Sequence, residues 1–446
     1  MNRPIDMIPG EIWIHIFQRL STTHHCPDLP ISAAAQSPYP CKIPAVVLSH
    51  VCSYWRSLVI NARELWTHID IDSDDFPEDR SEAYLARAGD IPLEVHISNR
   101  ATSYNAYETV PGSEDSLCRW AGFLIDIAPR ACSLIVQAFD SSALSQEFCR
   151  QAILIFIENC VPGRLKQLHI EIPRNPRDPD GHVIALPKVA EVLWHPVEVL
   201  RIYDFHPGWT SKLYYGLTEL RLIHSSPVLE SALVAVLKSN PKLRILQLYI
   251  RVNNVTPRNV PVVPVLLEDL EVLVPDVTPE TGRTAFLRRI QPGSKQLALS
   301  IANWRTDFIG RDEVISFFAR SNVSRLIVTR FRDYVELADL LSIAPTVREV
   351  ALEDVIYSEI GDESVLFPPT TLDTLYLTRS PNASESTWPI MEWIVQRHRV
   401  RKLTLWRYGP CYDGETITLE EQYSACTSTS VTLLPDAYLD PVECWK

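Results

Sequence analysis

Residues 243–248 read Leu-Arg-Ile-Leu-Gln-Leu, and this apolar-x-x-Leu-x-apolar pattern returns many times in the chain. The alternation at the end of each copy predicts a β-strand with one buried face. Between copies lie apolar stretches with helical spacing that end in a turn, such as 229–237 before Pro241. Each copy therefore predicts a strand, and each interval predicts a helix and a turn. The other copies lie at 165–170, 197–202, 217–222, 267–272, 297–299, 326–328, 347–352, 372–377 and 400–405, with a weaker one at 133–136.

The copies are spaced at nearly equal steps. From Leu134 to Leu403 the average step is about 27 residues, and leucine-rich repeats have a period of roughly 20–29 residues. The region therefore resembles an irregular leucine-rich-repeat solenoid, which implies parallel strands with helices on the convex side. Most copies lack the Asn or Cys of regular repeats, and Pro-rich stretches at 173–187 and 255–264 interrupt them. An ordinary α/β domain is the alternative, but it does not predict ten near-equal steps.

The residues between the leucines predict a binding face. Side chains alternate across a strand, so these residues face outward if the leucines face the core. A repeat array binds partners through its strand face, and Arg, Tyr and Trp dominate binding hot spots. A merely soluble polar face is the alternative. The predicted substrate-binding residues are Arg201, Tyr203, Arg221, Tyr249, Tyr376 and Trp406.

The first seventy residues carry a different, helical pattern. Apolar residues at Ile12, Ile16 and Leu20 follow each other in steps of four, which predicts an amphipathic helix over 8–20. A second apolar stripe predicts a helix over 45–60. Two helices this short do not bury such wide stripes against each other, so we expect apolar surface to remain for a partner.

These residues resemble the F-box. The resemblance is carried by Ile-Pro-Gly-Glu-Ile at 8–12, Ile-Phe-Gln-Arg-Leu at 16–20 and Val-Cys-Ser-Tyr-Trp-Arg-Ser-Leu at 51–58, with the exit Glu-Leu-Trp-Thr-His-Ile at 64–69. It implies docking on a Skp-type adaptor and, through it, on a cullin scaffold. A longer Pro-rich insertion at 21–44 departs from the family pattern. The implied adaptor-binding residues are Ile8, Pro9, Ile12, Ile16, Phe17, Leu20, Val51, Cys52, Trp55 and Leu58. A plain helical subdomain is the alternative.

The sequence predicts an α/β protein in which a small helical domain precedes the solenoid. We expect an F-box-like domain at 4–70, a cap or degenerate first repeats at 71–130, irregular repeats at 131–410, and a C-terminal cap or tail at 411–446. Within the second region, 66–71 and 93–97 alternate as strands do.

Composition excludes several classes of protein. The net charge of −13 without a basic block argues against nucleic acid as a partner. No apolar run approaches the length of a membrane helix, no signal-peptide core is present, and no nucleotide or hydrolase motif occurs. The ten cysteines contain no CxxC pair, which favours reduced thiols in a cytoplasmic or nuclear protein.

We expect neither a metal nor a cofactor. His24, His25, Cys26, Cys41, His50 and Cys52 lie close in sequence, but their spacing is not that of a zinc site. The acidic residues between Asp70 and Asp79 lack the glycine and closing glutamate of a calcium loop and are interpreted as a solvated strand exit.

The sequence therefore predicts a non-catalytic substrate-recognition subunit of a Skp-cullin-F-box ubiquitin ligase that holds an unknown protein substrate. One alternative is an adaptor-bound scaffold whose target is not ubiquitinated, which the insertion at 21–44 favours. A second is an enzyme whose site assembles in space from distant residues.

Overall fold

In a computed structural model the chain forms two compact units, Met1–Leu217 and Thr218–Lys446. The predicted insertion at 21–44 and the predicted tail at 411–446 lie largely outside the described residues. The domain boundaries predicted at 70, 130 and 410 stay predictions. The structure describes residues 8–22, 45–72, 78–99, 114–138, 143–173, 197–204, 207–302, 311–329, 334–353, 370–380, 388–408, 429–434, 440–442 and 445.

Unit 1 begins with short helices. The predicted helix over 8–20 is confirmed as α1 (Gly10–Thr22). The single helix predicted over 45–60 is wrong, because the structure has α3 (Ala45–Ser49) and α4 (Ser53–Asn61) instead. Cys52 takes an extended backbone between them, and its Sγ accepts a hydrogen bond from the Trp55 N–H at 3.4 Å. This N-cap starts α4 as a separate helix.

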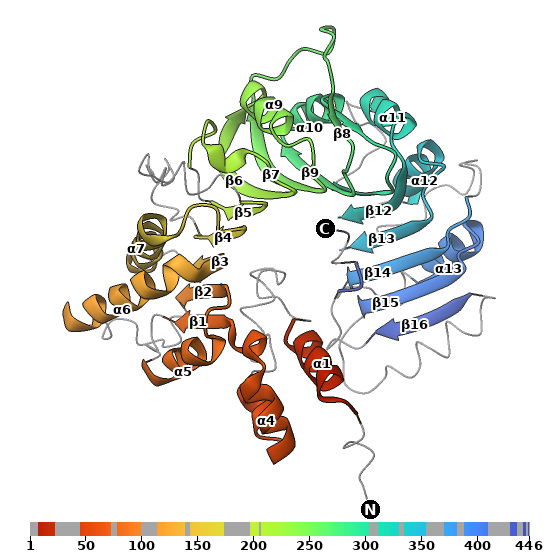
Figure 1. The fold of residues 1–446 in the computed structure, drawn as a ribbon. Coiled ribbons are helices and arrows are strands. Elements are labelled where there is room, and N and C mark those ends of the chain that lie inside the picture. The colour runs from red at the N-terminus through yellow and green to blue at the C-terminus, as the bar shows by residue number, and fades with distance from the viewer. Residues whose placement is uncertain are drawn as a thin grey trace, which may run out of the picture. The chain divides into compact units, whose positions relative to one another are not determined.

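A sheet of parallel strands follows in the order β1-β2-β3-β4-β5, with helices packed on one face (Figure 1). The strands predicted at 66–71 and 93–97 are confirmed. Ile69 pairs with Val95 and Ile71 with Ile97, and all four side chains are buried. The elements of unit 1 after α4 are η3 (Arg63–Trp66), β1 (His68–Asp72), α5 (Glu78–Ala88), β2 (Leu93–Asn99), α6 (Glu114–Ile127), η4 (Ala128–Arg130), β3 (Ala131–Ala138), α7 (Ala143–Asn159), β4 (Gln167–Glu171), β5 (Val199–Tyr203) and η5 (Lys212–Tyr214).

Unit 2 repeats the same arrangement with more strands. Its parallel strands follow the order β6-β7-β9-β11-β12-β13-β14-β15-β16, and a separate parallel pair joins β8 to β10. Its elements are β6 (Glu219–Leu229), α9 (Glu230–Lys238), β7 (Ile245–Asn253), β8 (Val265–Leu267), β9 (Val272–Thr278), α10 (Glu280–Arg288), β10 (Ile290–Pro292), β11 (Leu297–Ala302), α11 (Arg311–Ala319), β12 (Val323–Thr329), α12 (Tyr334–Ile343), β13 (Glu349–Glu353), β14 (Thr374–Ser380), α13 (Trp388–Arg397), β15 (Lys402–Tyr408) and β16 (Ser430–Leu434).

The repeated leucines form a ladder across the strands of unit 2. Each is buried on the helix-covered face, where burying a leucine contributes about 1.5–3 kcal/mol. This ladder explains why the pattern recurs, since every strand must supply an apolar residue at the same level. In strand order the members are Leu220, Leu246, Leu273, Leu299, Leu326, Val350, Leu375 and Leu403.

One predicted strand has the wrong register. The pattern at 267–272 predicts a strand anchored at Leu270, whereas β8 ends at Leu267 and β9 begins at Val272. The turn between them packs against Gly293, whose N–H donates to the Leu267 carbonyl at 3.1 Å. A Cβ at Gly293 would lie 2.3 Å from the Glu268 carbonyl oxygen, so only glycine fits there.

Candidate functional site

The N-terminal helices are held together by three aromatic rings. Trp13 and Phe17 of α1 lie 4.9 Å and 4.7 Å from the ring of Trp55 in α4, measured between centroids. Below them, the indole Nε1 of Trp66 donates to the Val59 carbonyl at 2.8 Å. Trp13, Phe17 and Trp66 are buried. These contacts fix α1 on α4 and settle which face of α1 points inward.

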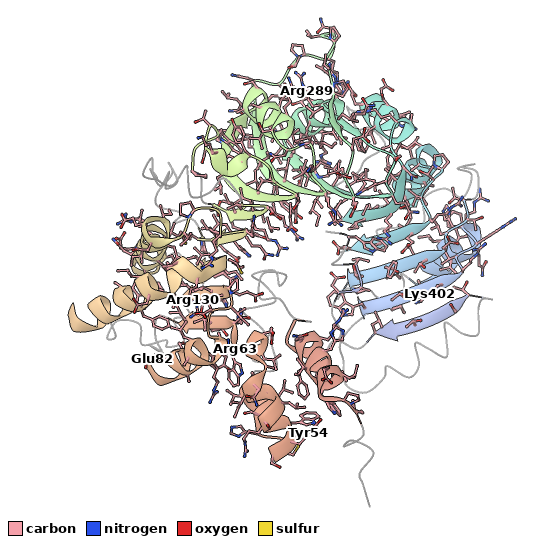
Figure 2. All side chains as sticks on the ribbon, viewed as in Figure 1. Tyr54, Arg63, Glu82, Arg130, Arg289 and Lys402 are labelled. Carbon is pink, nitrogen blue, oxygen red and sulfur yellow. The ribbon has the colours of Figure 1, made fainter. Side chains whose placement is uncertain are left out.

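The side of α1 that borders these buried rings is apolar and exposed. Ile12, Ile16 and Leu20, here called the α1 stripe, retain 51%, 36% and 37% of their accessible surface. Their four-residue spacing places them along one line of the helix. Val51 is also exposed, and so is Tyr54 of α4 (Figure 2). Burying such side chains against a partner would stabilise a complex, whereas in the free chain they contact water.

The predicted adaptor-binding residues therefore divide into three groups. Phe17 is fully buried within the helices, and Trp55 and Leu58 are half-buried against them. Cys52 is exposed and caps α4 through its sulfur. The remaining members, which have surface available to a partner, are Ile8, Pro9, Ile12, Ile16, Leu20 and Val51.

Unit 2 also has an apolar face, on the side of its sheet opposite the leucine ladder. We call this side of the sheet the open face. Residues Asp440–Val442 and Trp445, here called the tail segment, cover it. Val442 and Trp445 are buried there. The apolar cluster beneath them consists of Val272, Val274, Ala298, Ile327 and Ala351, with Ile245, Tyr249 and Tyr376 packed at its margin.

Trp445 is the main anchor of the tail segment. Its ring meets that of Tyr376 edge-on, with centroids 4.9 Å apart and planes at 87°. The Arg325 guanidinium lies 5.5 Å from the centroid of the same indole. Burial, with a contribution from Glu349, raises the pKa of the Tyr376 phenol. The tail segment thus completes a second hydrophobic core on the open face.

The six predicted substrate-binding residues lie in different surroundings. In unit 1, Arg201 and Tyr203 are half-buried on β5, and Tyr203 stacks on His169 at 5.4 Å. In unit 2, Arg221 pairs with Glu219 at 2.7 Å. Tyr249 and Tyr376 border the cluster beneath the tail segment.

The sixth predicted residue, Trp406, retains only 3% of its surface. Such a side chain is not available to a ligand in this conformation. The tail segment itself was missed by sequence reasoning, which treated 411–446 only as a cap or tail. The signal available was a valine and a tryptophan three residues apart after the last strand.

Comparison with known proteins identifies the N-terminal part of the chain. Residues 5–72 match the F-box-like family model, so the match covers α1, α3, α4, η3 and β1. It supports an F-box protein, and F-box domains generally bind Skp-type adaptors. No curated protein matches the chain. Among the described residues, no helix has both the length and the apolar character needed to cross a membrane.

Proposed function

We propose that the chain is the substrate-recognition subunit of a Skp-cullin-F-box ubiquitin ligase. The observation that carries the proposal is the exposed α1 stripe within the residues that match the F-box-like family. Its apolar side chains retain between 36% and 51% of their surface, and an adaptor helix or groove of apolar character would bury that remainder.

We further propose that the strands form an irregular leucine-rich-repeat solenoid that holds the protein target. The aligned ladder and the parallel order of the strands support this. The half-buried residues Arg201, Tyr203, Arg221, Tyr249 and Tyr376 are the proposed contacts, and the buried Trp406 is left out of this set. Tethering the target beside the ligase raises its effective concentration for ubiquitin transfer.

Adaptor capture tests the first part. Ile16→Asp should weaken binding to a purified Skp-type adaptor by roughly a hundredfold or more, since burying isoleucine contributes about 1.5–3 kcal/mol and an unpaired buried carboxylate adds a cost. Val263→Asp is the matched control, because Val263 is an exposed apolar residue of unit 2. Equal adaptor binding by folded Ile16→Asp and by the control would contradict the proposal.

Reconstitution with the adaptor, a cullin and the ubiquitin-charging enzymes separates the ligase from the scaffold. A ligase subunit should support ubiquitin transfer to proteins that it captures. Capture without transfer would favour the non-ligase scaffold.

A further inference from the structure

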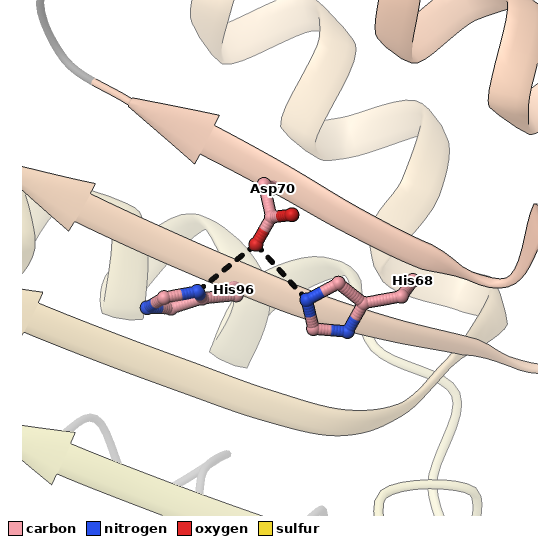
Figure 3. A group of neighbouring side chains, drawn as sticks. All are labelled: His68, Asp70 and His96. Carbon is pink, nitrogen blue, oxygen red and sulfur yellow. Dashed lines mark hydrogen bonds and ion pairs between the residues drawn. The ribbon is translucent and has the colours of Figure 1, made fainter. Parts of the chain in front are cut away.

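Two strands of unit 1 bring two histidines and an aspartate together on the face opposite their buried isoleucines. Asp70 of β1 pairs directly with His96 of β2, and His68 lies two residues before Asp70. The distances to Asp70 Oδ1 are 2.9 Å from His68 Nε2 and 3.0 Å from His96 Nδ1 (Figure 3). One donor atom from each residue falls within 4.8 Å of the others.

Neighbouring groups determine which nitrogen of His96 carries hydrogen. The Gln137 amide nitrogen donates to Glu171 Oε2 at 2.8 Å, so the carbonyl oxygen of the same amide faces His96 Nε2 at 2.8 Å. That oxygen only accepts, and His96 Nε2 must therefore donate. In the neutral ring the remaining nitrogen, Nδ1, carries a lone pair, and it points at a carboxylate oxygen.

His68 has the same arrangement. Its Nδ1 lies 3.4 Å from Glu94 Oε2 and its Nε2 faces Asp70 Oδ1. Both rings thus direct one nitrogen to an outer acceptor and the other to a single carboxylate oxygen. With Nδ1 of His68 donating to Glu94, two imidazole lone pairs would face one carboxylate oxygen, and either protons on the rings or a cation between them would offset the repulsion.

We propose that His68, Asp70 and His96 bind one divalent transition-metal ion of the Zn²⁺ class. Imidazole nitrogens suit such ions, and three protein donors leave a fourth position for water. Donors about 2.1 Å from a tetrahedral ion lie about 3.4 Å apart. To hold such an ion, the Asp70 oxygen would move about 0.5 Å away from each imidazole nitrogen, and donor atoms that lie up to 4.8 Å apart would approach by up to about 1.4 Å. Glu94 and Gln137 act as the outer acceptors that orient metal-bound histidines.

The surroundings allow the ion to enter. His96 is 96% buried, retaining 4% of its side-chain surface, whereas Asp70 retains 54%. The Asp70 carboxylate is therefore the solvent-accessible side of the group, whereas the His96 imidazole is enclosed by its neighbours. His68 and Asp70 belong to the segment that matches the F-box-like family, and His96 lies beyond it. The bound ion would clamp β1, at the end of that segment, to β2.

Zinc binding by the full chain tests the inference. The wild type, Asp70→Asn and His68→Ala are each treated with a chelator and exchanged into a buffer that contains a phosphine reductant. Zn²⁺ is then titrated into each protein. We expect each variant to lose one zinc per chain or to bind it at least tenfold more weakly. His15→Ala is the matched control, because His15 is an exposed histidine of α1, and it should bind zinc like the wild type.

Two further measurements keep the test decisive. Glu94→Gln should weaken zinc binding by about tenfold or more, because outer acceptors tune metal affinity. X-ray absorption of the wild-type zinc complex should show nitrogen and oxygen ligands only, including imidazoles, whether or not any variant folds. The site would be overturned by sulfur ligation, by unchanged zinc binding in folded Asp70→Asn, or by no zinc uptake at micromolar concentration. In the last case the three side chains would be held together by hydrogen bonds alone.

Discussion

The α1 stripe and the open face of unit 2 are both apolar, but only one of them is covered by the chain itself. Ile12, Ile16 and Leu20 contact water, whereas Val274 and Ile327 are buried in the cluster that Val442 and Trp445 complete. Apolar surface that the fold covers contributes to its stability, whereas apolar surface left bare contributes only when a partner arrives. The difference assigns packing to the cluster that the tail segment covers and adaptor docking to the α1 stripe.

Removing the cover should produce the largest loss of stability. Trp445→Ala should lower the free energy of unfolding of unit 2 by about 3–5 kcal/mol, because it deletes a buried aromatic ring and leaves a cavity. Chemical denaturation measures this. Tyr215→Ala, at an exposed aromatic of unit 1, is the control and should change stability by less than about 0.5 kcal/mol. Equal stability of Trp445→Ala and wild type would mean that the tail segment does not pack on the open face.

Acid should weaken unit 2 through a buried histidine. Burial, with a smaller contribution from Arg397, lowers the pKa of His398 to about 4 from an ordinary value of 6.5. The unfolded chain therefore binds a proton at higher pH than the folded chain does. The contribution of neutral His398 to the free energy of unfolding is fully present above pH 6.5, and it falls by about 3 kcal/mol as the pH drops to about 4.

The variant His398→Asn checks this pH dependence. Asparagine places a polar atom near the position of Nδ1, which lies 2.6 Å from Thr370 Oγ1. The fall in unfolding free energy between pH 6.5 and 4 should become shallower, whatever the stability at neutral pH. His50→Asn, at an exposed histidine, should keep the wild-type slope. A slope that survives unchanged in His398→Asn would contradict the assignment.

The smallest effect on stability is expected at the α1 stripe. Ile16→Asp should lower the free energy of unfolding by about 1 kcal/mol, because the side chain keeps 36% of its surface in water and loses only part of its packing. Phe17→Asp, one residue along the same helix, should be strongly destabilising because Phe17 is fully buried. Thermal melts of the two variants compare the faces directly. Similar losses from both would mean that the stripe is packed in the free protein.

Sequence reasoning predicted the features that depend on local periodicity. The leucine ladder and α1 follow from spacing, because each position must face the core at a fixed interval along a strand or helix. The break at Cys52 was missed because a thiol cap gives no periodic signal. The register of β9 was missed because the turn at Gly293 depends on a close contact with Glu268, a residue distant in sequence.

The candidate sites were predicted only in part. The exposed stripe was readable from its four-residue steps. The group of His68, Asp70 and His96 was not, because its members come from two strands and meet only through the pairing of Asp70 with His96. A signal existed, since all three occupy outward positions of the two strands predicted at 66–71 and 93–97. The tail segment left only a valine and a tryptophan three residues apart as a signal, and these do not indicate which strands they cover, because packing across several strands is not encoded in neighbouring residues.

The position of Trp445 in the chain has a consequence for biosynthesis. Synthesis runs from the N-terminus, so β9 to β14 leave the ribosome before the residues that cover their open face. At about 5–20 residues per second, the chain from Tyr376 to Trp445 takes several seconds to emerge. During that interval Val274, Ile327 and their neighbours lack their final cover. The nascent protein thus passes through a stage in which this apolar cluster is accessible to chaperones. The rate of translation through the last segment determines how long that stage lasts.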